Sequence, residues 1–564
     1  MSTNGASNGV DSKQQQNKKD KTSKNGPSAL DPALIEEKRR ARAEKKEREA
    51  REKADKEAAA AASGTSLPTL DERGNPLFAP RQWGKVDGVQ EEASQGSQRL
   101  KVLSWNMLAQ GLVRRKLFPG SDALRWKDRE DGLAAELIGH GWDVGCFQEV
   151  DRIECHAETL RKAGYSHVYA KGYAAKQHGL MLAWRSRANA QAASSSDQIF
   201  ESEPIATETL YYDDAEVTPG RTASSRITRN IAIFAAVPFK SKADSGVILA
   251  TTHLFWHPMH AYERVRQAGL LVRALDAFRS RKDAPWTRWA VVLAGDFNDQ
   301  PHSASYGLLT GRGLDEHGCD EIARSSVVHE SVDRRSKQQN EAGVQKAQAT
   351  ASEKSAKEAG QTADNRDEDI EGVAEDDEEE EEEEGGADDQ MLKNCRSAKP
   401  SDGLLSLDEF KQLFDLSQPL PSPQNPPASA SGAKPKSSLL SAYATAYHRL
   451  SDPSEHLNTF SHPTRGRERW DDETWHEGQP NVHRHLAGTS AGNEPMWTLY
   501  SSLFGLTLDF IFLLPLTRGA ANPYPRVTKL LRTHPTDVVK VGLPKKNVCV
   551  SDHVAIGAEI EVEI

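Results

Sequence analysis

The sequence predicts a layered α/β domain, with sheets buried beneath helices, that is interrupted by long disordered insertions. Short runs rich in β-branched and other apolar residues alternate with stretches of helical periodicity, and this alternation predicts stacked layers. The chain has 564 residues, of which 27% are charged and only 37% hydrophobic. Such a composition indicates that much of the chain lies outside a core.

The predicted strands and helices fall in two parts of the chain, 100–325 and 436–564. In the first part, strands are expected at 100–108, 143–150, 179–184, 230–237, 246–254 and 291–296, and helices at 125–141 and 259–281. In the second part, "MWTLYSSLFGLTLDFIFLLP" resumes the fold. The segment "SDHVAIGAEIEVEI" closes it, because the alternation after Val554 is typical of a last strand.

The other segments are expected to be irregular. Residues 1–30 are polar and of low complexity, which predicts disorder, and 63–99 is expected to be a linker. Residues 326–435 are acidic and rich in Pro and Ser, too polar to offset the entropy of ordering, so they predict a disordered insertion. Within it, "LSLDEFKQLFDL" predicts a short amphipathic helix, and a second irregular insertion is expected at 452–493.

Residues 31–62 predict a single solvated helix. Asp31 and Pro32 form a helix start signal, and the alternating charges that follow can pair four residues apart, with almost no apolar stripe. One interpretation is a charged spacer. The other is a basic arm that binds RNA or ribosomes, or a nuclear import signal.

The overall charge does not exclude a nucleic-acid partner. The formal net charge is -11, but the unbroken acidic run at 375–384 supplies most of this excess. The rest of the chain is close to neutral, so the sign of the total says little about partners.

The cysteines and the hydropathy pattern predict an intracellular protein, in the cytoplasm, the nucleus or both. The five cysteines are scattered, without a pair at metal-ligand or redox spacing, which predicts reduced thiols. The N-terminus has no apolar core of the kind that a signal peptide needs. The longest apolar stretch, around "LDFIFLLPL", is short and contains Asp509, so no membrane segment is expected.

A set of polar residues interrupts or ends the apolar strands. In "VVLAGDFNDQP", residues 291–301, a buried strand leads directly into Asp296 and Asn298, and Gly295 is expected to let the backbone turn there. The whole set is Asn106, Glu149, His253, Asp296, Asn298, Asp509, Asp552 and His553. Each residue alone has a structural alternative as a cap, a turn residue or a satisfied core group. Together, at strand ends, they suit an oxygen-ligated metal ion and a histidine general acid or electrophile.

These residues lie in motifs that resemble a known family. The segments "SWNML", "FQEV", "TTHLFW", "GDFND", "LDFIF" and "SDH" resemble, in this order, the motifs of the endonuclease/exonuclease/phosphatase superfamily of magnesium-dependent phosphoesterases. The resemblance covers roughly 100–320 and 436–564 and implies a four-layer α/β sandwich of two packed sheets flanked by helices. Within the superfamily, "HLFWHP" and "SAYATAYHRL" resemble the deadenylase-like branch. With the basic arm, they point to the fungal Ngl-type RNA exonucleases, which mature ribosomal RNA 3′ ends.

The resemblance implies a role for each residue of the metal and water sites. Glu149 is the implied principal magnesium ligand, and Asn106 and Asp552 complete the metal environment. Asp296 is implied to position and deprotonate the attacking water, and Asn298 to orient it.

The remaining site residues are implied to act on the substrate. His553 would stabilise the pentacovalent phosphorane or protonate the leaving group, Asp509 would orient His553, and His253 would contact the phosphate. Substrate binding is expected from Trp256, Asn230 and His257. Of the aromatic residues near the motifs, Trp256 is the one we expect to stack on an unpaired base.

We therefore expect a magnesium-dependent 3′–5′ RNA exonuclease, with Mn²⁺ as a substitute ion, that matures ribosomal RNA 3′ ends. The expected partners are single-stranded RNA 3′ ends and pre-ribosomal particles. His178 and His257 stand where deadenylase relatives have aspartates, which leaves a preference for poly(A) open. No leucine-rich repeats precede the domain, so nothing supports membership of the large deadenylase complex. A poly(A) deadenylase, a phosphatase on RNA ends or nucleotides, and a non-catalytic RNA- or ribosome-binding scaffold remain as alternatives.

Overall fold

The structure is a computed structural model in which residues 69–71, 73–174, 176–186, 198–338, 392–420, 438–450, 459–461, 486–515, 524–540 and 542–564 are described. The chain divides into two compact units, Met1–Ser66 and Leu67–Ile564, and the fold below is that of the second. The predictions for 1–62, for the acidic run and for most of 452–493 lie outside the described residues. Within the described residues, no helix is long and apolar enough to cross a membrane.

Seven strands of the described chain form the first sheet, in the order β1-β16-β17-β2-β3-β5-β4. Their bounds are β1 (Trp83–Lys85), β16 (Arg526–Leu531), β17 (Ile556–Glu563), β2 (Ser97–Asn106), β3 (Val144–Val150), β5 (Gly179–Arg185) and β4 (Tyr165–Ala170). Only β2 and β3 are parallel neighbours in this sheet. Their carboxyl ends therefore meet at the same edge of the sheet.

The second sheet contains six strands among the described residues, in the order β12-β15-β9-β8-β7-β6. Their bounds are β12 (Leu440–Ser441), β15 (Asp509–Leu513), β9 (Ala290–Asp296), β8 (Lys242–His253), β7 (Ile231–Phe239) and β6 (Ala206–Tyr211). β8 and β9 are parallel, with His253 opposite Asp296. β15 runs antiparallel to β9 and pairs Asp509 with Asp296. This register places three of the predicted site residues in one row across three strands.

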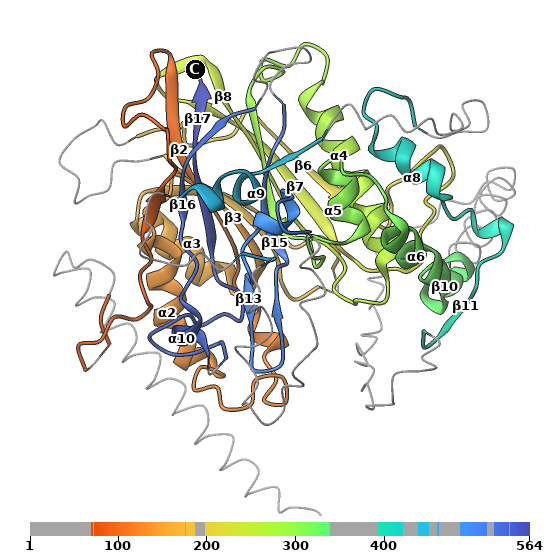
Figure 1. Ribbon diagram of the computed structural model, residues 1–564, viewed down its shortest axis with the longest axis horizontal. Helices are drawn as coiled ribbons and strands as arrows, with labels where there is room; N and C mark the ends of the chain where they lie inside the picture. Colours follow the sequence, from red (N-terminus) through yellow and green to blue (C-terminus); the bar gives the residue numbers. More distant parts are fainter. Residues whose placement is uncertain are drawn as a thin grey trace, which may run out of the picture. The chain divides into compact units, whose positions relative to one another are not determined.

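The two sheets pack face to face through an apolar layer, and helices cover their outer faces. The inner layer joins Val102 and Val144 of the first sheet to Leu249 and Val292 of the second. The main covering helices are α2 (Trp126–Gly139), α3 (Ile153–Lys162), α4 (Ala261–Arg279), α5 (Ala304–Leu309), α6 (Glu316–Arg324) and α8 (Leu407–Phe414). In Figure 1, α2 and α3 lie on one side of the sheets and α4, α5, α6 and α8 on the other. The four-layer α/β sandwich predicted from the sequence is confirmed.

Shorter elements connect these layers. They are η1 (Gln110–Leu112), β10 (Val327–His329), β11 (Cys395–Ser397), η3 (Pro400–Asp402), α9 (Ala442–Ala446), η4 (Tyr447–Arg449), η6 (Ala491–Asn493), β13 (Leu499–Tyr500), β14 (Gly505–Leu506) and α10 (Thr536–Val539). All five cysteines lie in described segments and are free thiols, as the sequence predicts.

The segment expected to be a linker, 63–99, belongs in part to the domain. β1 pairs with β16, a strand that was not predicted from the sequence. The indole Nε1 of Trp83 donates to the carbonyl of His140 at 2.9 Å, and Phe78 is buried against Gly139 of α2. The linker prediction is wrong for these residues because their apolar side chains cover the end of α2 and the edge of the sheet.

The insertion expected at 326–435 also contains ordered structure. β10 pairs with β11, and α8 forms in the predicted amphipathic segment. A capping box starts α8, since Ser406 Oγ accepts from the Glu409 amide and the Glu409 carboxylate accepts from the Ser406 amide. Leu413 of α8 is buried against Gly269 of α4. Disorder is therefore the wrong prediction for this part of the insertion, because an apolar helix face docks on α4.

Candidate active site

Strands of both sheets deliver the predicted polar residues to one place. Asn106 is the last residue of β2, and Glu149 lies one residue before the end of β3. His253 and Asp296 end the parallel pair β8 and β9, while Asp509 begins β15. Because β15 is antiparallel to β9, its first residue lies at the edge where β9 ends. His553 precedes β17, which pairs with β2, so the second part of the chain reaches the same edge.

The side-chain amide of Asn106 joins the two sheets. Its Nδ2 donates to Glu149 Oε1 at 3.0 Å and to Asp296 Oδ2 at 2.9 Å, and its Oδ1 accepts from the Leu108 amide at 3.0 Å. The two carboxylate oxygens therefore converge on one amide nitrogen. Asn106 is a hydrogen-bond donor here, and it would act as the predicted metal ligand only after its amide rotates.

The backbone of β3 aims the Glu149 side chain. The pairing of β3 with β5 shifts register between Phe147 and Val150, and Glu149 has a φ of 53°, in the left-handed region. Glu149 Oε2 accepts from the Ala109 amide at 2.9 Å. Burial would raise the pKa of Glu149, but nearby His253 and the hydrogen bonds from Asn106 and Ala109 outweigh it and lower that pKa to about 2. Glu149 is therefore a carboxylate with a fixed direction.

Asp296 is buried at the end of β9. Its Oδ1 accepts from the Asn298 amide at 2.9 Å, and Asn298 Nδ2 donates to the Leu254 carbonyl at 2.9 Å. Burial raises the pKa of Asp296, an effect that the neighbouring His553 partly offsets. A raised pKa makes a carboxylate a stronger proton acceptor. The Asn298 side chain was expected to orient water, and in the structure it is hydrogen-bonded to the carbonyl of Leu254, the residue that follows β8.

Gly295 has a different role from the one predicted. It lies inside β9 rather than at a turn, and a Cβ atom added to it would stand 2.2 Å from the carbonyl oxygen of Thr252 on β8. The absence of a side chain lets β8 approach β9 closely. His253 lies opposite Asp296 at the next position of the same strand pair.

His553 and Asp509 form a hydrogen-bonded pair. His553 Nδ1 lies 2.8 Å from Asp509 Oδ2, and the same oxygen accepts from Thr498 Oγ1 at 2.6 Å. Burial alone would lower the pKa of His553, but the carboxylates of Asp509 and Asp296 outweigh it and raise that pKa well above its usual value. The imidazole is thus held as a cation. Its Nε2 faces Asp296, with 3.6 Å between Nε2 and Asp296 Oδ2.

His253 faces both carboxylates from the other side. Its Nε2 lies 3.9 Å from Glu149 Oε1 and 3.7 Å from Asp296 Oδ2. Burial lowers the pKa of His253 in spite of these carboxylates. Asn230, expected to bind substrate, donates from Nδ2 to the His253 carbonyl at 2.6 Å. The buried Oδ1 of Asn230 accepts no hydrogen bond within the described residues.

Asp552 lies beside this group without a direct hydrogen bond to Glu149 among the described contacts. Burial and the charge of Glu149 raise the pKa of Asp552, although His553 opposes them, and the result is a pKa of about 6. The Asp552 carboxyl therefore lies near the predicted metal ligands and takes up a proton at a higher pH than an ordinary aspartate.

Two residues that support the site, Arg129 of α2 and Thr498, were not predicted from the sequence. Arg129 is fully buried and donates to the carbonyls of Met107, Leu108 and Val550 at 2.6 to 2.7 Å. It ties the segment that follows Asn106 to the loop that carries His553. A long charged side chain at an inward position of an amphipathic helix is the signal that could have identified it.

The aromatic side chains differ in exposure. Trp256 is 62% exposed, whereas Trp105, Phe255, Tyr262 and Trp497 are buried in the core. The ring of His257, a predicted substrate contact, lies between Trp256 and His260, with centroid distances of 5.1 and 5.0 Å. Trp256 is thus the member of this set that can offer a face to an unpaired base.

The donor set fits a hard divalent cation. Glu149 and Asp296 present carboxylate oxygens around the same amide nitrogen. One or two carboxylates, completed by water and substrate phosphate, suit such an ion. A second combination, Asp296, Asp509 and His553, also has its potential ligand atoms within 4.8 Å of one another.

Residues 103–362 match the Endonuclease/Exonuclease/phosphatase family. This stretch, a little under half of the chain, is therefore similar to that family. The family match covers Asn106, Glu149, His253 and Asp296, and it ends before Asp509, Asp552 and His553. The pairing of β15 with β9 and of β17 with β2 brings these three residues from the second part of the chain to the residues that the match covers.

Two curated relatives in fungi are named as probable RNA exonucleases. One, from Schizosaccharomyces pombe, is 31% identical over 316 residues, which cover 55% of this chain and 57% of the relative. The other, NGL3 from Saccharomyces cerevisiae, is 34% identical over 230 residues, which cover 40% of this chain and 42% of the relative. The chain spans about half the length of these relatives.

A solved structure is also similar to this chain. The crystal structure of ANGEL2, a 2′,3′-cyclic phosphatase, in complex with adenosine-2′,3′-vanadate aligns with 86% of this chain and 100% of its own. The TM-score is 0.48 and the sequence identity 16%.

Proposed function

We propose that this chain is a metal-dependent hydrolytic phosphodiesterase that removes nucleotides from the 3′ end of RNA. The observation that carries the proposal is the geometry around buried Asp296, whose Oδ2 shares the Asn106 amide with Glu149 and lies 3.6 Å from His553 Nε2. This arrangement combines a proton acceptor, a charge for a cation and a proton donor within one site. The family match over 103–362 and the names of the fungal relatives support the reaction class.

The chain's own side chains account for the proton transfers. A water molecule loses a proton to Asp296 while its oxygen bonds to phosphorus, and the bond from phosphorus to the 3′ oxygen of the preceding nucleotide breaks. His553 Nε2 donates a proton to that 3′ oxygen, and Asp509 holds the imidazole by Nδ1. A divalent cation beside Glu149 and Asp296 would neutralise charge that develops on the phosphoryl oxygens. We assign this role to Mg²⁺, with Mn²⁺ as a substitute.

The substrate proposal rests on the surface next to the site. Trp256 follows His253 by three residues and exposes its ring, so it can stack on a base of a single strand. The Ngl-type resemblance extends the proposal to maturation of ribosomal RNA 3′ ends inside the cell, with pre-ribosomal particles as partners. Stacking on Trp256 would use the face of a base and not its edge, so it would accept many RNA sequences.

A 5′-labelled RNA with a 3′ extension tests the activity. With wild-type protein and Mg²⁺, we expect a ladder that shortens from the 3′ end, and with a chelator we expect intact RNA. Asp296→Ala is expected to leave the RNA intact under both conditions. Asp244→Ala, which removes an exposed carboxylate far along β8 from His253, is the matched control and should cleave like the wild type.

Other outcomes would replace the proposal. Loss of a terminal phosphate without shortening would favour the phosphatase, and shortening confined to poly(A) would favour the deadenylase. Binding of RNA without any change in it would favour the scaffold. Shortening that Asp296→Ala retains would show that the reaction does not use this site.

A further inference from the structure

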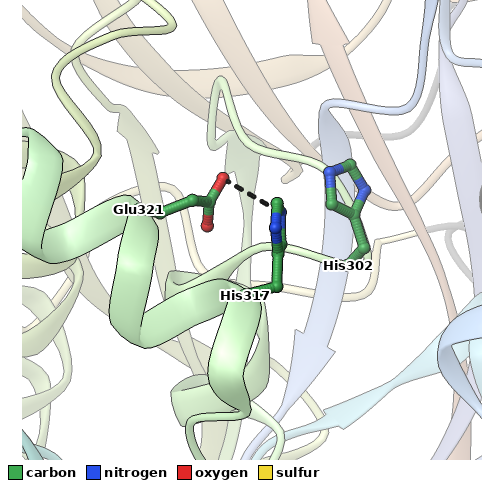
Figure 2. A group of neighbouring side chains, drawn as sticks. All are labelled: His302, His317 and Glu321. Carbon is green, nitrogen blue, oxygen red and sulfur yellow. Dashed lines mark ion pairs between the residues drawn. The ribbon is translucent and has the colours of Figure 1, made fainter.

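A second group of metal-ligating side chains lies outside the proposed catalytic residues. His302 belongs to the segment between β9 and α5, and His317 and Glu321 are four residues apart on α6. Their potential ligand atoms all lie within 4.8 Å of one another. Figure 2 shows the two imidazole rings side by side, with the Glu321 carboxylate directed toward His317. Two separate segments of the chain thus converge on one point.

Local contacts hold these donors in place. Asp315 caps α6 by accepting from the Gly318 amide at 2.8 Å, which fixes the first turn where His317 lies. Glu321 Oε2 accepts from the Ala304 amide at 3.1 Å, while Oε1 lies 3.7 Å from His317 Nε2. One oxygen of the carboxylate therefore anchors α6 to the start of α5, and the other faces the histidine.

The position of His302 is also constrained. Its ring is stacked on Phe460, with 6.0 Å between centroids, and lies 5.5 Å from the His317 ring. The His317 side chain is 54% exposed, so an ion in solution can reach the group. The site is thus partly preorganised and open on one side.

We propose that His302, His317 and Glu321 bind a zinc ion, with water as the fourth ligand. Two imidazoles and one carboxylate are donors that zinc accepts, whereas magnesium prefers oxygen ligands alone. Three protein ligands plus water complete a tetrahedral zinc site, in which ligand atoms lie about 2.0–2.2 Å from the metal. The potential ligand atoms lie within 4.8 Å of one another, and zinc binding would draw them closer together.

The ion would stabilise the segment that connects the proposed active site to α5. Residues 297–303 run from Asp296 to the start of α5 and include Asn298. In the same segment, Asp299 Oδ2 accepts from Ser305 Oγ at 2.5 Å. A zinc ion would add a link from His302 to α6. It would stabilise this segment without touching the reacting atoms.

Zinc titration of the metal-free full chain tests the proposal. Bound zinc per chain is measured by elemental analysis after removal of free ion, and thermal unfolding is followed with and without zinc sulfate. The variants are His302→Ala, His317→Ala and Glu321→Gln, and the last retains an acceptor for the Ala304 amide. His448→Ala, at an exposed histidine of η4, is the matched control.

We expect wild type and His448→Ala to bind one more zinc ion per chain than His302→Ala and His317→Ala. We also expect zinc to raise the unfolding midpoint less in these two variants and in Glu321→Gln than in wild type. Subtraction of a variant's zinc content from that of the wild type cancels the zinc that other histidines of the chain bind in both proteins. Equal zinc contents in wild type and in the exposed variant His317→Ala, or no zinc bound by wild type, would overturn the proposal.

Discussion

Replacement of Asp509 by asparagine should separate the charge of this residue from its shape. In the structure, Asp509 Oδ2 accepts from both Thr498 Oγ1, at 2.6 Å, and His553 Nδ1, at 2.8 Å. An asparagine oxygen in the same position can accept both hydrogen bonds, but it carries no negative charge. The variant therefore keeps the geometry of the site and loses the anion that holds His553 as a cation.

The expected magnitude follows from the lost charge. A hydrogen bond to a charged group contributes about 1.5–3 kcal/mol, and each ~1.4 kcal/mol corresponds to a tenfold change in rate. We therefore expect kcat/KM for RNA to fall about 10- to 150-fold in Asp509→Asn. The pKa of His553, which the Asp509 carboxylate raises, should fall at the same time.

The pH profile gives the sign of this effect. A raised pKa keeps His553 protonated, and so able to donate a proton, up to a higher pH in the wild type than in the variant. The alkaline limb of the kcat/KM profile should therefore move to lower pH in Asp509→Asn. Initial rates measured across pH, together with an NMR titration of the His553 ring, report the shift. A slower variant whose alkaline limb and ring titration stay where they are in the wild type would refute this reasoning.

Three further variants test other parts of the molecule. Gly295→Ala should lower the free energy of unfolding by about 1–3 kcal/mol in denaturant titrations, because its Cβ would stand 2.2 Å from the Thr252 carbonyl; an unchanged midpoint would contradict the close approach of β8 and β9. Burial raises the pKa of Glu494 from 4.5 to about 7 despite the hydrogen bond from Tyr306. The protonated Glu494 therefore contributes its full stabilisation below pH 4.5, and this contribution is lost as pH rises through 7. In Glu494→Gln, the free energy of unfolding should not show this loss, which is worth about 3 kcal/mol at pH 8 in the wild type. The same pH dependence of unfolding in the wild type and in Glu494→Gln would contradict this prediction. Trp256→Ala should raise KM for single-stranded RNA about 5- to 150-fold and leave thermal stability unchanged, since base stacking contributes about 1–3 kcal/mol; an unaltered KM would exclude the stacking role.

The strands and the strand-end residues could be predicted because their signals are local. An apolar run that leads directly into Asp296, or a run that carries Glu149 near its end, is visible in a few consecutive residues. The helices at 125–141 and 259–281 have enough turns for their periodicity to be read, and both formed as α2 and α4. The side chains that the patterns singled out lie together at one edge of the two sheets.

What the sequence did not predict depends on contacts between distant segments. β1 is short and pairs with β16 more than 400 residues away, so neither strand has a strong pattern of its own. The helix pattern places Arg129 on the inward face of α2, but its partners, the carbonyls of Met107 and Val550, come from distant segments that the pattern does not contain. The direction of the Asn106 amide is likewise set by two carboxylates from different sheets, which a linear pattern does not contain.

The most direct measurement is the incorporation of ¹⁸O from labelled water into the products of RNA cleavage. If Asp296 activates water, each nucleotide released by the wild type in Mg²⁺ should carry one ¹⁸O on its phosphate, and Asp296→Asn should release almost none. Mass spectrometry of the nucleotides, with cleavage by Asp244→Ala as control, gives the count. Released nucleotides without ¹⁸O, or full labelled release by Asp296→Asn, would contradict hydrolysis by water at this site.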